Sequence, residues 1–340
     1  MPRIVLMSTS VWGRALRGVP RLSREEWNGL DAIAKWLIAT RAAVLIMTFI
    51  SAAIAGIFAA RAGKFDFGLW ALVAIGLMMA HATNNLLNDM TDYAKGVDRG
   101  NYYRAQYGVQ PLEAGFWTMR DAWRYAIFTG GVAALCGLLL VIARGGLTLP
   151  LMLAGAFFVL AYTWPLKYVG LGEVAVLLVW GPLMIGGGYY VIAGEWDWNV
   201  VLGGLPYALG TTMVIFGKHI DKRAADKEKR IFTLPVILGD QLARAVAIGC
   251  MVLQYVLTVV LVLVGFFTPL MLVVALALPT FLFTYRMFRQ PKPTERPEWF
   301  PADAWPTWLA AFAFLHNRAF GLLFLLGLIV ESALRSVGVL

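Results

Sequence analysis

Long apolar runs alternate with short polar segments along the whole chain. Each run has about 20 residues, the length that an α-helix needs to cross roughly 30 Å of hydrocarbon. Turn-forming residues divide two close pairs of runs, at Gly145-Gly146 and at Thr268-Pro269. The pattern predicts an all-α integral membrane protein with about nine transmembrane helices. The runs cover residues 37–60, 67–87, 123–143, 147–164, 173–193, 200–218, 242–266, 268–285 and 308–333.

The composition excludes an ordinary soluble domain. Hydrophobic residues make up 60% of the 340 residues and charged residues 14%, whereas soluble domains are about half apolar and about a quarter charged. Cys136 and Cys250 both lie within apolar runs. We therefore expect no disulfide framework and no cysteine metal site.

Lysine and arginine residues gather on one side of the predicted membrane. With a cytosolic N-terminus, the inner loops are residues 88–122, 165–172, 219–241 and 286–307, and they hold nearly all of these cations. The positive-inside rule requires this asymmetry. We therefore expect a multi-pass protein of the plasma (inner) membrane whose N-terminus and active-site loops are cytosolic. The exceptions are Arg61, Lys64, Arg144 and Arg335.

The same pattern divides the chain into an arm and one membrane domain. Residues 1–34 are basic and contain no apolar core of signal-peptide length, which is typical of a cytosolic N-terminal arm. Residues 35–340 form a single transmembrane domain. A membrane face next to anionic lipid explains the formal net charge of +9. We therefore expect membrane lipid, and no nucleic acid, as a partner.

Polar oxygens gather in residues 84–98, NNLLNDMTDYAKGVD, at the cytosolic end of the second run. We call this segment the first acidic station. Clustered carboxylates raise one another's pKa unless a cation lies among them, and oxygen ligands without His or Cys suit Mg²⁺. The alternative is an ordinary solvated helix end. The positions that share one helical face by spacing are Asn85, Asn88, Asp89 and Asp92, with Asp98 beyond Gly96.

Residues 218–240, KHIDKRAADKEKRIFTLPVILGD, form a second acidic station after the sixth run. Asp221 and Asp226 could hold a metal there while the neighbouring cations hold a polyanion. Tyr162 and Lys167, in a third inner loop, could reach the same anion. The alternative for the station is a solvated surface of mixed charge. Its cations are Lys218, Lys222, Arg223, Lys227, Lys229 and Arg230.

Four sequence segments together resemble a known family. NxxNDxxDxxxGxD spans residues 85–98, and YTxPxKxxGLGE spans 162–173. GPLMIGGGYYV and TLPVILG follow at residues 181–191 and 233–239. The chain is similar over about residues 37–335 to the UbiA superfamily of intramembrane prenyltransferases. It looks most like the menaquinone branch, which prenylates 1,4-dihydroxy-2-naphthoate.

The resemblance implies a helical bundle around a central cavity that opens sideways to lipid. Two aspartate-rich motifs would face each other there and bind Mg²⁺ and the diphosphate of an isoprenoid donor. The expected catalytic residues are Asp89, Asp92, Tyr162 and Lys167. The expected substrate contacts are Asn85, Asn88, Arg41, Lys95, Lys222 and Arg223, although Arg41 is also typical of an interfacial anchor. The expected metal ligands are Asp89, Asp92, Asp98, Asp221 and Asp226.

The chain departs from the family pattern in the second acidic station. Asp221 and Asp226 are five residues apart, about 140° around an ideal helix, and do not share a face. Either a bulge or helix end lies between them, or one is not a ligand. The menaquinone branch usually has Asn-Asn-x-Arg-Asp where residues 217–221 read GKHID, and Gly-Lys-Arg where residues 230–232 read RIF. These changes concern the acceptor more than the fold or the donor.

The expected reaction is attack of an electron-rich aromatic ring on an allylic cation in a pocket that excludes water. The partners are then a prenyl diphosphate donor and an aromatic or lipid acceptor. Alternatives are another acceptor (homogentisate, 4-hydroxybenzoate or a lipid alcohol) or internal alkene attack in a cyclase. A cation-coupled transporter is a rival of another class, although transporters usually hold their acids near the midplane. Aromatic residues that could face the cation are Tyr162, Trp164, Trp180, Tyr189 and Tyr190.

Overall fold

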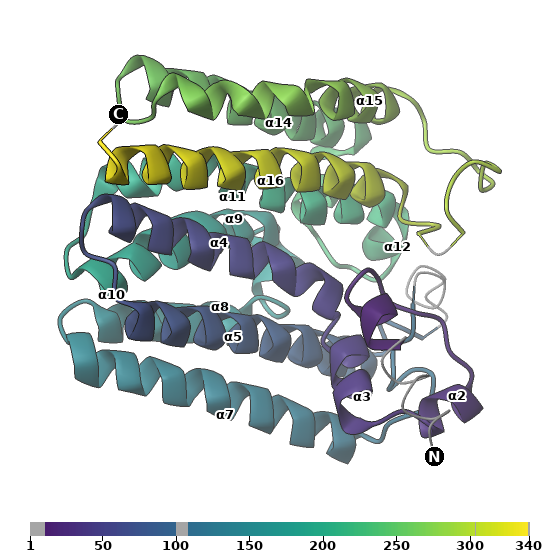
Figure 1. The fold of residues 1–340 in the computed structure, drawn as a ribbon. Helices are drawn as coiled ribbons and strands as arrows, with labels where there is room; N and C mark the ends of the chain where they lie inside the picture. The colour runs from purple at the N-terminus through teal and green to yellow at the C-terminus, as the bar shows by residue number, and fades with distance from the viewer. Residues whose placement is uncertain (1–10, 100–107, 303, 339–340) are drawn as a thin grey trace.

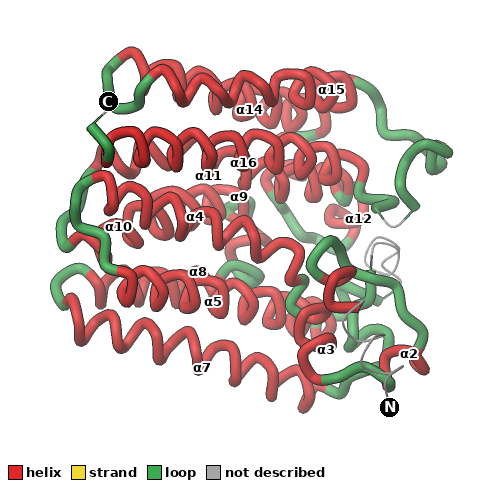
Figure 2. Tube along the Cα trace, in the orientation of Figure 1, coloured by secondary structure: helices red, strands yellow, loops and turns green. Residues whose placement is uncertain are grey.

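The computed structural model describes residues 11–99, 108–302 and 304–338. Every regular element in this part of the chain is helical (Figure 2). The long helices run side by side as a bundle, and the short helices α2 (Arg24–Asn28), α3 (Ala32–Ala39) and α12 (Arg223–Glu228) lie at one end of it (Figure 1). The expected all-α fold is confirmed.

Each of the nine apolar runs coincides with a helical segment. Eight segments among the described residues are long and apolar enough to cross a membrane, and the ninth, α8, spans only Thr148–Ala161. The single-helix spans are α4 (Ala42–Arg61), α5 (Phe67–Ala94), α7 (Met119–Arg144), α11 (Trp198–Asp221), α14 (Asp240–Leu263) and α16 (Trp308–Ser336). The composite spans are α9 (Gly172–Leu178) with η2 (Val179–Gly187) and α10 (Gly188–Ala193), and η3 (Pro269–Ala277) with α15 (Leu278–Arg289).

The helices form an inner and an outer set. The apolar windows of α4 and α11 are 67% and 78% buried, whereas those of α7 and α14 are 22% and 28% buried. The exposed aliphatic side chains of the outer helices suit contact with lipid, because lipid tails are as apolar as they are. The inner helices pack around large side chains that include Phe58, Tyr207, Phe320 and Phe324.

One span is irregular at its centre. Residues Val179–Gly187 form a π-helical segment that contains Pro182, whose ring removes a backbone donor and widens the helix locally. A Cβ atom on Gly186 would lie 2.6 Å from Val201, and one on Gly188 would lie 3.1 Å from Ala55. Glycine is needed at these positions because neighbouring helices approach the backbone closely.

The N-terminal arm is packed against the end of the bundle where α2, α3 and α12 lie (Figure 1). Trp27 is 1% exposed. Its ring centroid lies 5.5 Å from that of Phe116 and 5.6 Å from that of Trp117. Arg21 donates to the carbonyl of Ala302 at 2.7 Å, and Arg24 donates to that of Gly115 at 2.6 Å. The described part of the predicted arm, from residue 11, therefore connects two loops that are far apart in the sequence. Residues 1–10 lie outside the described residues.

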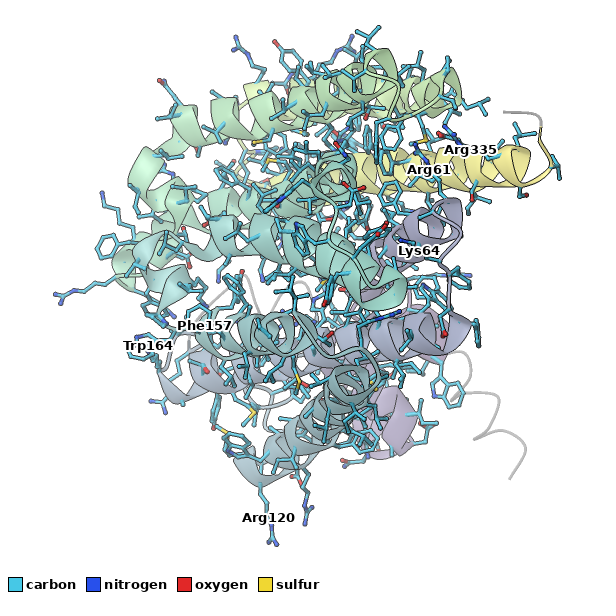
Figure 3. The ribbon with its side chains drawn as sticks, turned by 90° about the vertical axis from the view of Figure 1, so that its left-hand side faces the viewer. Arg61, Lys64, Arg120, Phe157, Trp164 and Arg335 are labelled. Atoms are coloured by element: carbon cyan, nitrogen blue, oxygen red, sulfur yellow. The ribbon has the colours of Figure 1, made fainter. Side chains whose placement is uncertain are left out.

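A buried carboxylate organises the opposite end. Glu331 on α16 is 1% exposed and pairs with Arg61 at 3.5 Å and Arg335 at 3.0 Å. It also accepts from the backbone N–H of Thr268 at 3.3 Å. Arg61 and Arg335 lie close together (Figure 3). Two of the four cations that fell outside the inner loops are thus held by one acid.

Replacement of Glu331 by Ala should destabilise the protein, because it leaves the partly buried Arg61 guanidinium without its carboxylate. We expect a loss of about 3 kcal/mol, typical for removal of one partner of a buried ion pair. Thermal unfolding in detergent measures it. Glu295→Ala is the control because Glu295 is exposed. An unchanged midpoint for Glu331→Ala would show that the network does not stabilise the fold.

Candidate functional site

One large cavity of about 760 Å³ lies within the bundle. Its wall is apolar over most of its length, where α5, α7 and α8 contribute Leu, Val, Met, Gly and Ala side chains. Polar side chains from both acidic stations line the same cavity. They include Asn85, Asn88 and Asp92 from the first station and Lys218, His219, Lys222 and Asp226 from the second. The tertiary structure therefore brings the two stations together.

The carboxylates of the first station are buried in ion pairs. Asp89 pairs with Arg41, and Lys167 donates to both oxygens of Asp92 at 2.9 Å. Both acids are less than a tenth exposed. Asn88 donates to the hydroxyl of Thr163 at 3.1 Å. Of the four positions that share one helical face by spacing, Asn85, Asn88 and Asp92 line the cavity, whereas Asp89 lines a separate small pocket.

Arg41 reaches the first acidic station because it is a non-helical residue between α3 and α4. It has φ 56° and ψ 55°, in the left-handed region, between α3 and α4. This conformation costs an ordinary residue about 1 kcal/mol. The guanidinium then lies against α5, where it donates to the carbonyl of Asn85 at 3.2 Å and pairs with Asp89. Arg41 is thus part of the cavity wall as well as a helix-end cation.

The third inner loop supplies Tyr162 and Lys167, and both line the cavity. Tyr162 ends α8, and the short helix η1 (Leu166–Val169) positions Lys167 against Asp92. Burial raises the pKa of the Tyr162 phenol, and the nearby Glu173 and Asp92 carboxylates raise it further. Tyr162 is therefore a protonated hydrogen-bond donor at neutral pH.

The two acids of the second station point in different directions because a helix ends between them. Helix α11 ends at Asp221, and α12 begins at Arg223. Asp226 lies at the cavity, 3.6 Å from Lys222. Asp221 instead accepts from the backbone N–H groups of Leu309 and Ala310 at 3.0 and 3.1 Å. It caps the first turn of α16, which explains the spacing noted in the sequence.

Lys292 completes the environment of Asp221, at 3.6 Å from its carboxylate. Burial lowers the pKa of Lys292, and the Asp221 carboxylate opposes that shift. The Asp221 side chain is fully buried. The structure thus places this predicted metal ligand in a helix cap, away from the cavity wall.

Four other candidates also lie outside the cavity wall, and Asp89 is one of them. Asp98 accepts from the amide of Gln110 at 2.9 Å. Lys95 lies over the rings of Trp164 and Tyr168, 4.8 and 4.6 Å from their centroids. Arg223 is 3.8 Å from Asp240 at the surface. These side chains shape the loops around the site.

The candidate aromatic wall is only partly at the cavity. Tyr162 and Trp180 line it. Trp164 is 57% exposed on the outside of the molecule (Figure 3). Tyr189 donates to Glu195 at 3.1 Å, and the hydroxyl of Tyr190 accepts from a backbone N–H at 3.0 Å. Tyr189 and Tyr190 therefore join α10 to the loop that follows it and to the start of α8.

The polar end of the cavity suits an anion with a hard cation. Five Lys and Arg side chains line the cavity, against two carboxylates. Among the described residues, no group of three or more His, Cys, Asp or Glu side chains forms a metal site by itself. Asp92, Asp226 and the amide oxygen of Asn88 offer oxygen ligands to one space. Mg²⁺ commonly takes a few such ligands together with waters and substrate phosphates, so the residues fit Mg²⁺ bound with a phosphate.

Comparison of the whole sequence with known protein families supports this geometry. The model of the UbiA prenyltransferase family matches residues 49–317. The chain belongs to this family. The match covers most of the bundle and both acidic stations. With the long apolar helices, it makes the chain an integral, multi-pass membrane protein.

The relatives that match this chain have low sequence identity to it. UbiA prenyltransferase domain-containing protein 1 of Gallus gallus is 25% identical over 211 residues, which are 58% of this chain and 60% of that protein. The Danio rerio protein of the same name is 26% identical over 193 residues, 53% of this chain and 54% of that protein. The chain thus spans between about half and three fifths of the relatives' length. Their names do not specify the menaquinone branch.

Solved UbiA structures share the fold. The apo structure of a UbiA homolog from Aeropyrum pernix K1 has a TM-score of 0.63 and 18% identity, and covers 84% of this chain and 97% of its own. The structure of a UbiA homolog from Archaeoglobus fulgidus bound to GPP and Mg²⁺ has a TM-score of 0.62 and 14% identity. It covers 88% of this chain and 99% of its own.

Sequence reasoning missed several residues of the wall. Arg17 belongs to the N-terminal arm, and only the folding of that arm brings it to the cavity. His219 lines the cavity and lies 2.6 Å from the buried carboxylate of Glu173. His81 lies deeper in α5. A polar residue within an apolar run is a signal for function, and it would have indicated His81. By contrast, His316 pairs with the hydroxyl of Tyr255 at 3.0 Å, outside the cavity wall.

Asp221 and Asp226 should respond differently to replacement by Ala. Asp221→Ala removes a helix cap and should cost at least about 1 to 2 kcal/mol of stability, with little change in Mg²⁺-dependent diphosphate binding. Asp226→Ala should weaken that binding by about tenfold, and its thermal midpoint should also fall because Asp226 is buried and paired with Lys222. Thermal unfolding and titration calorimetry with inorganic diphosphate measure the two effects. Lost binding at a wild-type midpoint in Asp221→Ala would instead identify Asp221 as a ligand.

Proposed function

We propose that the protein transfers an isoprenyl group from a prenyl diphosphate to an aromatic acceptor in a Mg²⁺-dependent reaction. The acceptor is 1,4-dihydroxy-2-naphthoate or a related quinone precursor, as in the menaquinone branch. One observation carries the proposal. The acids and cations of two distant loops line the polar end of a single cavity whose remaining wall is apolar.

The cavity matches the two halves of the donor. A diphosphate would contact Arg41, Lys167 and Lys222 at the polar end, where charge-assisted hydrogen bonds are strong. The isoprenoid tail would lie along the apolar wall between α5, α7 and α8. Gly155 leaves room for it there, since nothing lies within 4 Å of the place that a Cβ atom would take.

Mg²⁺ would be held by Asn88, Asp92 and Asp226, with Asp89 and Asn85 completing the first station. When bound, the ion neutralises negative charge on the departing diphosphate. Asp221 is not in the proposed ligand set, because its oxygens bind the first turn of α16. Asp98 supports the station through Gln110.

The chain's own residues prepare the donor for cleavage. Lys167 exchanges Asp92 for a diphosphate oxygen, and the protonated phenol of Tyr162 donates a further hydrogen bond. Such groups stabilise the charge that develops on the leaving group. The apolar wall excludes water, which would otherwise convert the allylic cation to an alcohol. The acceptor ring then forms the new C–C bond as the C–O bond to the diphosphate breaks.

The distribution of Lys and Arg supports a cytosolic position for this site. The second station, the loop with Lys167 and the described part of the arm lie at the cation-rich end, as the positive-inside rule requires. We assign that end to the cytosol and the bundle to the plasma (inner) membrane. The diphosphate would then enter from the cytosol and the tail from the bilayer.

Replacement of Asp92 by Asn should reduce prenyl transfer by about 100-fold, the scale for loss of one electrostatic contact in a transition state. Chelation of divalent metal should abolish transfer by the wild-type protein. The assay incubates purified protein with geranylgeranyl diphosphate and 1,4-dihydroxy-2-naphthoate, homogentisate or 4-hydroxybenzoate, and detects products by mass.

The control is Asp66→Asn, because Asp66 is exposed, lies far from the cavity, and caps α5 as Asn also can. It should transfer at the wild-type rate. Full activity with a chelator, or in Asp92→Asn, contradicts the metal-dependent reaction. If product forms only with another acceptor, the protein is still a prenyltransferase, and that acceptor replaces 1,4-dihydroxy-2-naphthoate in the proposal.

A further inference from the structure

A second polar cluster lies inside the apolar part of the cavity. Its central residue, His81, is one helical turn from Asn84 and Asn85 on α5, and all three line the cavity. One turn of α-helix advances about 5.4 Å along the axis. His81 is therefore about one turn deeper in the membrane than Asn85, and about two turns deeper than Asn88, the nearest residue on α5 that is proposed to hold Mg²⁺.

The His81 ring is held in one orientation. Its Nδ1 atom lies 2.7 Å from the hydroxyl of Thr48, which is completely buried on α4. The ring meets Trp180 edge to face, with the centroids 5.2 Å apart and the planes at 89°. These two contacts engage the Nδ1 atom and fix the tilt of the ring. The described residues give Nε2, the second nitrogen, no hydrogen-bond partner.

Trp180 also has an unused hydrogen-bonding group. It lines the cavity from the π-helical segment η2, and π-helical segments are frequent at functional sites. Its buried indole N–H has no hydrogen-bond partner among the described residues. An unsatisfied buried donor costs about 1 to 3 kcal/mol, so its presence beside His81 requires an explanation.

We propose that His81 and Trp180 form the binding site for a hydroxyl group of the aromatic acceptor. This assignment rests on the proposed prenyl transfer. The position of the site suits it, since His81 lines the same cavity as the polar end and lies about two helical turns from Asn88, toward the apolar wall that would hold the allylic part of the donor. The surrounding wall is apolar and fits a planar ring, with Val44, Met47, Val179, Leu183 and Met184.

A hydroxyl is the group that this pair can bind in either tautomer of His81. If the Thr48 hydroxyl donates to Nδ1, then Nε2 carries the proton and donates to the acceptor oxygen. If Nδ1 carries the proton, Nε2 accepts from the acceptor hydroxyl. The indole N–H of Trp180 donates to the same oxygen in both cases. A ketone or ether oxygen satisfies only the first arrangement.

The assignment gives His81 a positioning role through the substrate, with no proton transfer. The acceptor ring carbon forms a C–C bond to the allylic carbon, and the C–O bond to the diphosphate breaks with its electron pair on the leaving oxygen. The attacked ring carbon then loses a proton, or carbon dioxide when it carries a carboxylate. The bound hydroxyl keeps the ring oriented throughout.

The test compares His81→Leu with His81→Gln under the transfer assay above. His81→Leu should raise the KM for 1,4-dihydroxy-2-naphthoate by about tenfold, the effect of one lost hydrogen bond to a buried group. The KM for geranylgeranyl diphosphate should stay within about twofold, since the diphosphate site is intact. His81→Gln should recover most of the loss because an amide both donates and accepts. Trp180→Phe should change the acceptor KM in the same direction.

His316→Leu is the matched control, because His316 is also a buried histidine that pairs with one hydroxyl, and it lies outside the cavity wall. It should lower the thermal midpoint without changing the acceptor KM. Hydrolysis of the donor without acceptor, which reports the diphosphate site alone, should be unchanged in His81→Leu.

A methyl ether of the acceptor provides a readout that needs no stable variant. The wild-type protein should prefer the free hydroxyl over the ether, and His81→Leu should lose that preference. Equal use of both by the wild type assigns the tautomer in which Nε2 donates, and a preference that is as large in His81→Leu as in the wild type overturns the assignment. Normal transfer with an unchanged acceptor KM in His81→Leu overturns this assignment but not the proposed function. An equal rise in the KM for the acceptor and the KM for geranylgeranyl diphosphate does the same. A wild-type protein that neither transfers nor hydrolyses the donor overturns the proposed function, and this assignment with it.

Discussion

Buried pairs of opposite charge hold the cation-rich end of the molecule together. Arg41 with Asp89 joins the start of α4 to α5, and Lys167 with Asp92 joins the loop after α8 to the same helix. Leaving either partner unpaired in an apolar surrounding costs several kcal/mol. Each acid on α5 therefore fixes the position of another segment, and the cavity takes its shape from these pairs.

The same pairs make the cavity suitable for a metal-bound anion. A diphosphate with Mg²⁺ presents charges of both signs, so Lys167 and Asp92 can each exchange one partner for another. The exchange avoids an uncompensated buried charge at every stage. His81, about two turns along α5 from Asn88, and Trp180 beside it are neutral groups in a more apolar region, which suits a neutral hydroxyl. Along α5, the polar groups of the cavity thus change from charged pairs at one end to neutral hydrogen-bonding groups further in.

Irregular backbone directs several of these side chains. Arg41 adopts a left-handed conformation between two helices, Asp221 and Asp226 are separated by a helix end, and Trp180 lies in a π-helical segment. A regular helix would have left these residues on other faces. Spacing rules assume regular helices, so they could group the polar residues of α5 but could only pose the alternatives for the second station.

The apolar runs by themselves determined the helical membrane architecture, because a backbone in lipid must satisfy its own hydrogen bonds. Local spacing likewise grouped the polar residues Asn85, Asn88, Asp89 and Asp92 of α5. The tertiary structure alone decided that Asp221 caps α16, that Arg17 reaches the cavity from the arm, and that Thr48 orients His81. Each of these depends on a partner far away in the sequence, and neither composition nor periodicity contains that information.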